Sequence, residues 1–172
     1  MYTKENLIFM DQALNQAKLA LKKEEVPVGA LIVDNMGNIL SKAYNKTEKN
    51  KCQTGHAEVL AIQKACKKLK TWRLDNCSIY VSLEPCLMCL GLIQLSRIKA
   101  LYFGAVSKEF GSGLQEALKH KLYKKDLLIV GGLKETESID ILRKFFMNLR
   151  KLRKVNCERK SRILRKGKKE IT

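Results

Sequence analysis

The sequence lacks any apolar run of about 18 residues, which excludes a helix that spans a membrane. Its first twenty residues also lack the apolar block and the small-residue cleavage site of a secretory signal. We therefore expect a cytoplasmic protein with no membrane partner. Acidic residues are few as well: 17 Asp and Glu stand against 34 Lys and Arg, which gives a formal net charge of +17.

The positive charge is concentrated towards the C-terminus. Residues 143–172 carry 13 Lys and Arg against two acids, a net charge of +11, whereas residues 1–142 carry 21 against 15, a net charge of +6. This distribution suits a polyanionic partner, most simply nucleic acid. A solvated charged surface without a ligand explains the same composition, so charge alone leaves both interpretations open.

A chain of 172 residues suits one domain with a hydrophobic core of its own. Apolar spacing predicts helices over residues 3–23, 56–69, 85–95 and 136–155, and short apolar runs predict strands over 28–34, 38–44, 78–83, 98–104 and 127–132. Five strands interleaved with helices indicate an α/β fold whose sheet is covered on both faces. We expect residues 1–155 to form the domain and residues 156–172 a mobile basic tail.

Histidine is scarce, and without a secretion signal the six cysteines are not expected to form disulfides. Only Cys86 and Cys89 are close in sequence, at the start of a predicted helix whose N–H groups favour thiolates. His120 lies between lysines in a predicted surface segment, which leaves His56 as the candidate ligand. Two thiolates and one imidazole fill three of the four positions around zinc and leave one for water.

Glu58 follows His56 by two residues and is the candidate general base. Two thiolates already neutralise Zn²⁺, so a water on the metal is acidified only in part and needs a nearby base. A thioredoxin-like redox pair and a structural zinc site are the alternatives, but the first needs no H-x-E and the second lacks an evident fourth ligand. The combination of H-x-E with P-C-x-x-C about 30 residues later is the signature of zinc deaminases.

Together these motifs resemble the cytidine-deaminase-fold enzymes, and most closely the bacterial tRNA-specific adenosine deaminases. The resemblance covers residues 3–153, nearly the whole chain. The segments that carry it are Glu25–Ala30 (E-V-P-V-G-A), Tyr44-Asn45, His56–Glu58, Val81–Cys89, Ser96–Ile98, Phe103–Ala105 and the late pair Phe145-Phe146.

The resemblance implies a three-layer α/β/α fold with a mixed five-stranded sheet, a homodimer with active sites near the subunit interface, and one zinc ion per chain. The implied reaction is hydrolytic deamination of adenosine to inosine at the wobble position of a tRNA anticodon stem-loop, usually that of arginine tRNA. Glu58 is then the proton shuttle between zinc-bound water and the base. The other implied roles are zinc ligation by His56, Cys86 and Cys89; base contact by Asn45, Pro27, Val28, Gly29, Ala30 and Ala57, with the Ala57 and Cys86 backbone near the attacking water; and RNA contact by Phe145, Phe146, Arg150 and Arg153.

One loop, residues 104–113, departs from the family pattern. Ser107 stands at the usual aspartate position and Glu109 at the usual lysine position. The resemblance implies that this loop lies near the RNA, so the departure bears on contacts to the flanking nucleotides and on the choice of RNA, and not on the zinc chemistry. An enzyme of the same fold that acts on guanine, cytosine or dCMP is an alternative, as is a non-catalytic RNA-binding protein with a zinc-stabilised core. Locally, Val26–Gly29 could be strand-entry packing, and one phenylalanine of Phe145-Phe146 could pack inward while the other faces RNA.

Overall fold

The structure, a computed structural model, describes residues 2–107 and 127–167, and for residues 156–167 it describes the backbone alone. The predicted helices and strands are present, and a short helix, α2, is added to them. In chain order the elements are α1 (Lys4–Lys22), β1 (Gly29–Val33), β2 (Ile39–Tyr44), α2 (Thr47–Asn50), α3 (Ala57–Leu69), β3 (Ser78–Leu83), α4 (Leu87–Leu95), β4 (Ala100–Ala105), β5 (Leu128–Val130) and α6 (Glu135–Gly167).

The five described strands form one mixed sheet in the order β2-β1-β3-β4-β5. β1 pairs with β2 and β3 in antiparallel fashion, whereas β3–β4 and β4–β5 are parallel. The β1–β2 hairpin turns where the sequence predicts it, because Gly37 adopts φ +82° and Asp34 accepts hydrogen bonds from the Met36 and Asn38 N–H groups. β3 has β1 on one side and β4 on the other, so its carboxyl end, which leads to the start of α4, lies inside the sheet.

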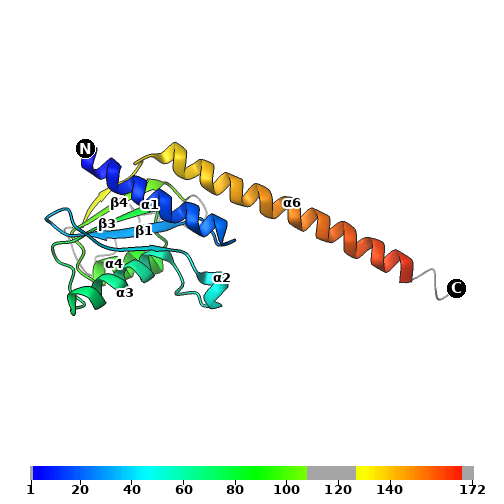
Figure 1. Cartoon of the computed structure of the whole chain (residues 1–172), viewed down its shortest axis with the longest axis horizontal. Coiled ribbons are helices and arrows are strands. Elements are labelled where there is room, and N and C mark those ends of the chain that lie inside the picture. Colours follow the sequence, from blue (N-terminus) through cyan, green and yellow to red (C-terminus); the bar gives the residue numbers. More distant parts are fainter. Residues whose placement is uncertain (1, 108–126, 168–172) are drawn as a thin grey trace.

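Helices cover the sheet on both faces, which confirms the three-layer α/β/α prediction (Figure 1). Along β1, Ala30 and Ile32 pack towards α3 and α4, while Leu31 and Val33 pack towards α1. Gly29 belongs to the α1 side: a Cβ at this position would lie 2.1 Å from the Ala13 carbonyl oxygen. The candidate zinc ligands all come from the opposite layer, where α3 and α4 begin.

The last helix is longer than predicted. α6 continues to Gly167, twelve residues past the expected end at residue 155, and its second half projects away from the domain (Figure 1). Residues 156–166 contain neither Gly nor Pro, so nothing in the sequence ends the helix before Gly167. The mobility of residues 156–172 stays a prediction. No described helix is long and apolar enough to cross a membrane.

Candidate metal centre and active site

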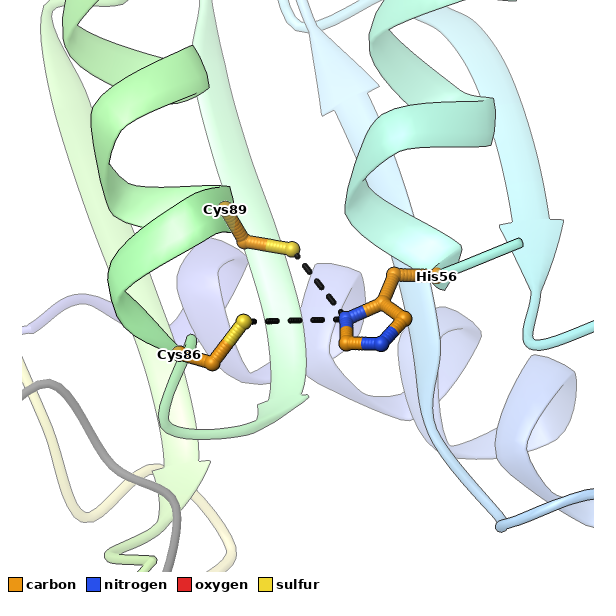
Figure 2. A group of neighbouring side chains, drawn as sticks. All are labelled: His56, Cys86 and Cys89. Atoms are coloured by element: carbon orange, nitrogen blue, oxygen red, sulfur yellow. Dashed lines mark hydrogen bonds between the residues drawn. The ribbon is translucent and has the colours of Figure 1, made fainter. Parts of the chain in front are cut away.

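Two helix N-termini bring the predicted zinc ligands together. His56 is the N-cap of α3, Cys86 is the N-cap of α4, and Cys89 lies one turn into α4. Neither N-cap side chain forms a capping hydrogen bond, so both are free to point into the site. Figure 2 shows the two sulfur atoms directed at the His56 ring from the neighbouring helix.

The spacing of the three groups fits zinc. Nδ1 of His56 lies 3.7 Å from Sγ of Cys86 and 3.4 Å from Sγ of Cys89, and all three ligand atoms lie within 4.8 Å of one another. Tetrahedral zinc with Zn–S bonds of about 2.3 Å and Zn–N bonds of about 2.0–2.1 Å places sulfur and nitrogen about 3.6 Å apart. Among the described side chains no fourth ligand atom joins this group, which leaves room for a small molecule.

The electrostatics of the cluster favour a thiolate. A hydrogen bond from Cys89 and a second from His56 lower the pKa of Cys86 to about 4, and the Cys86 sulfur in turn raises the pKa of His56. The same hydrogen bond, with burial, raises the pKa of Cys89. Both helix N-termini direct their positive ends at this pair, which suits the charged form that a metal ion binds.

Glu58 lies in the first turn of α3 and is buried, with 4% of its surface exposed. Burial raises the pKa of its carboxyl, and the carboxylate hydrogen-bonds the Cys89 thiol. A carboxyl whose pKa is raised holds a proton more readily than a free glutamate and is suited to accept one and return it. Glu58 thus lies beside the ligand group, as the motif spacing predicts.

Asn45 reaches the site from the end of β2. Its Oδ1 atom accepts a hydrogen bond of 2.7 Å from the Ala57 N–H group, which orients the side chain and turns its amino group into the natural donor to a ligand. The Ala57 N–H group, predicted to lie near the attacking water, is bound by Asn45. The role of Asn45 as a base contact stays a prediction.

The predicted base-pocket segment, residues 27–30, divides between two layers. Pro27, Val28 and Ala30 are buried, and Val28 and Ala30 face α3 and α4 as a pocket wall would. Gly29 instead lets α1 approach the sheet, which is the strand-packing interpretation of this residue. Only its backbone is placed to serve a pocket.

The four predicted RNA contacts all lie on α6. Phe145 is buried and Phe146 is 44% exposed, and their rings meet edge to face at 5.3 Å. One phenylalanine of the pair thus packs inward and the other lies on the surface, as the sequence predicts. Arg150 and Arg153 are exposed. Contact with RNA remains a prediction for all four. Glu109, His120 and the side chain of Cys157 lie outside the described residues.

Sequence reasoning assigned no role to Glu84, which precedes Pro85 and is buried. Its carboxylate accepts a 3.0 Å hydrogen bond from the Ser107 N–H group, and so ties the end of β4 to the segment that carries Cys86. A glutamate directly after a buried apolar strand is the signal that could have identified it, since a carboxylate there needs hydrogen-bond donors.

Comparison with known proteins decides the family. The sequence profile of the cytidine and deoxycytidylate deaminase zinc-binding region matches residues 3–105. The chain belongs to this family. The matched segment contains His56, Glu58, Cys86 and Cys89, so the family's zinc-binding region coincides with the observed cluster.

Within the family the chain is similar to enzymes that act on tRNA. A tRNA-specific adenosine deaminase of Bacillus subtilis is 42% identical over 149 residues, which cover 86% of this chain and 92% of that protein. A structure from a study of A-to-I editing by tRNA:A34 deaminases has a TM-score of 0.73 at 36% identity, covering 78% of this chain and 99% of the other. A guanine deaminase structure from Bacillus subtilis has a TM-score of 0.58 at 32% identity, covering 73% and 82%.

Proposed function

We propose that this chain catalyses the hydrolytic deamination of adenosine to inosine at the wobble position of a tRNA, most simply arginine tRNA, with one zinc ion bound per chain. The observation that carries the chemistry is the His56, Cys86 and Cys89 cluster with the buried Glu58 beside it. The choice of substrate is supported by the similarity along nearly the full length of a tRNA-specific adenosine deaminase.

The chain's own residues account for the proton transfers. His56, Cys86 and Cys89 would hold zinc, which when bound is a Lewis acid that lowers the pKa of a water molecule. Glu58 takes a proton from the attacking water as its oxygen bonds to C6 of adenine, and returns it to the purine ring nitrogen. The second proton of the water, on the hydroxyl group now bonded to C6, passes to the amino group, the C6–N bond breaks and ammonia leaves, so adenosine and water give inosine and ammonia.

The substrate must place one base deep in the site. Glu58 is buried, so the adenine has to leave the stack to reach it. An anticodon loop is single-stranded already, which keeps the free energy of this step low. The exposed Phe146, Arg150 and Arg153 on α6 offer one stacking surface and two phosphate partners for the flanking nucleotides.

The proposal is tested by incubating the zinc-loaded protein with an unmodified tRNA that carries adenosine at the wobble position. Inosine is read as guanosine by reverse transcription, so conversion appears as an A-to-G change at that one position. Free adenosine, guanine, cytosine and dCMP are assayed in parallel for released ammonia. Deamination of a free base or nucleotide without tRNA conversion would favour the alternative enzyme, and no turnover on any of them would contradict both.

Replacing Asn45 by Asp separates its two roles. Aspartate still accepts the Ala57 N–H bond, and its charge suits the N-terminus of α3, so we expect unchanged zinc content and thermal stability. It cannot donate a hydrogen bond at neutral pH, so kcat/KM for tRNA should fall by about tenfold or more through loss of one buried bond to the base. A wild-type kcat/KM in this variant would show that Asn45 serves only α3.

We propose that the chain forms a homodimer through the outer face of α3 and α4. An apolar groove of about 640 Å³ runs along this face. It is lined by Thr54, Val59, Ile62, Gln63, Cys66, Trp72, Met88, Leu92, Leu95 and Ser96. Met88 lies between the ligands Cys86 and Cys89 in sequence, so a partner on this face would border the metal site. Exposed apolar patches of this kind mark interaction surfaces.

Changing Leu95 to Glu should separate the subunits, because Leu95 is 48% exposed on this face and a carboxylate there would be buried without a partner. Light scattering should give twice 19.6 kDa for the wild type and 19.6 kDa for the variant. Ile8 is 60% exposed on α1, in the opposite layer, so Ile8→Glu is the matched control and should leave the mass unchanged. A monomeric wild type, or a dimeric Leu95→Glu, would contradict this interface.

A further inference from the structure

Glu25 carries a buried carboxylate that takes no part in the proposed proton transfers. It lies between α1 and β1 and is only 2% exposed. Its Oε2 atom accepts a hydrogen bond of 3.0 Å from the Glu48 N–H group, and its Oε1 atom accepts one of 2.8 Å from the Lys49 N–H group. Both donors belong to α2, more than twenty residues later in the chain.

These two bonds supply what α2 lacks locally. The first turn of a helix leaves N–H groups without partners, and these are ordinarily satisfied by the side chain at the N-cap. The N-cap of α2 is Lys46, whose side chain makes no such bond. Glu25 takes its place from a distance, and because its carboxylate is buried, the two N–H bonds also offset the free energy lost by removing it from water.

Residues 46–55, the 46–55 loop, connect Asn45 to His56 and close on themselves. The Lys46 N–H group donates to the Gly55 carbonyl at 2.8 Å, which joins the two ends of the loop. Gly55 packs so tightly that a Cβ there would lie 2.8 Å from Cα of Thr47. The ends are joined again just outside the loop by the bond from the Ala57 N–H group to Asn45.

The loop therefore fixes two groups of the site at once. Asn45 precedes it, His56 follows it, and the loop's own bonds set the distance between them. The first end of the loop is held to the sheet already, because Asn45 directly follows β2 and its N–H group donates to the Val28 carbonyl at 3.1 Å. Glu25 adds a second tie in the middle of the loop, because it stands two residues before Pro27 and binds the loop at α2.

We propose that Glu25 is a positioning residue: its carboxylate anchors the 46–55 loop and so holds Asn45 and His56 in register with the rest of the site. This inference rests on the proposed deaminase function for its catalytic consequence, but not for the loop anchoring itself. Both hydrogen bonds described for the Glu25 carboxylate go to the backbone of α2, so its effect on the site passes through the loop.

The test is Glu25→Gln, which keeps the length of the side chain but replaces one acceptor oxygen by an amino group. One of the two α2 N–H groups then faces a donor instead of an acceptor. Glu24 is adjacent, exposed and of the same charge, so Glu24→Gln is the matched control. For each protein we would measure zinc content, thermal stability, amide hydrogen exchange, and kcat and KM for tRNA per zinc-loaded site.

For Glu25→Gln we expect full zinc content, faster exchange confined to residues 46–57, and a kcat/KM lower by about tenfold to a hundredfold, since a displacement of about 1 Å costs about 10²-fold. KM should rise together with the fall in kcat, because the Ala57 N–H bond that orients the Asn45 side chain is displaced with the loop; a purely structural effect would lower the loaded fraction and leave KM unchanged. Glu24→Gln should match the wild type in every measurement.

Wild-type kinetics or wild-type exchange of residues 46–57 in Glu25→Gln would overturn the proposal, and so would general unfolding, which would make Glu25 a residue of global stability. If the wild type itself makes no inosine, the proposed function fails, while the exchange measurement still decides whether Glu25 anchors the loop.

Discussion

Glu58→Gln should slow turnover by about 10²–10⁴-fold and leave the metal in place. Glutamine has the shape of glutamate but cannot take a proton from water, and general acid–base catalysis contributes about 10²–10⁴-fold to rate. We therefore expect kcat to fall by about that factor with unchanged zinc content, because Glu58 is not one of the three ligands. Inosine formation is followed under single-turnover conditions, and zinc is measured by elemental analysis of the same sample.

The matched control is Glu5→Gln, which removes the same charge from an exposed position on α1. It should deaminate tRNA at the wild-type rate. A Glu58→Gln enzyme within about tenfold of the wild type would mean that another group carries the protons. Loss of zinc from this variant would instead place Glu58 among the groups that hold the metal, against the geometry of the cluster.

Cys86→Ser should remove zinc without disturbing α4. Serine is among the best N-cap residues, so the helix that begins after position 86 keeps its start. The Cys86 thiolate, by contrast, is one of the three described groups predicted to hold zinc, and zinc binding contributes many kcal/mol, about 10–16 in zinc-finger peptides. We expect less than stoichiometric zinc, no turnover, and a melting temperature that no longer responds to added zinc.

Cys52→Ser is the control for this variant, because Cys52 is exposed and lies outside the cluster. It should retain one zinc ion and full activity. Stoichiometric zinc in Cys86→Ser would show that Cys86 is not a ligand.

The cluster of His56, Cys86 and Cys89 was predictable from sequence because each of the three residues lies in a local pattern with a physical meaning. His56 and Cys86 begin helices, and Cys89 follows Cys86 by the three residues that put both sulfurs on one side of a helix start. The prediction placed Pro85 inside α4, whereas the helix begins at Leu87 with Cys86 as its N-cap in extended conformation. That shift is what leaves the Cys86 side chain free to face His56.

The 46–55 loop could not be predicted, because its structure depends on a residue distant in sequence. Polar residues with no apolar spacing give no sign of α2, whose first turn is completed by Glu25. The hydrogen bond to the amide oxygen of Asn45 could not be predicted for the same reason, since its donor, Ala57, belongs to α3, twelve residues later. The extension of α6 was missed because its apolar spacing fades near residue 155 while residues of good helix propensity continue.

X-ray absorption at the zinc edge tests the central claim most directly. One zinc ion per chain should show two sulfur neighbours at about 2.3 Å and two nitrogen or oxygen neighbours at about 2.0–2.1 Å, one from His56 and one from a solvent molecule. Three or four sulfur neighbours, or a shell completed by a second histidine, would describe a closed structural site. Either result, or protein that binds no zinc at all, would contradict a deaminase centre built on His56, Cys86 and Cys89.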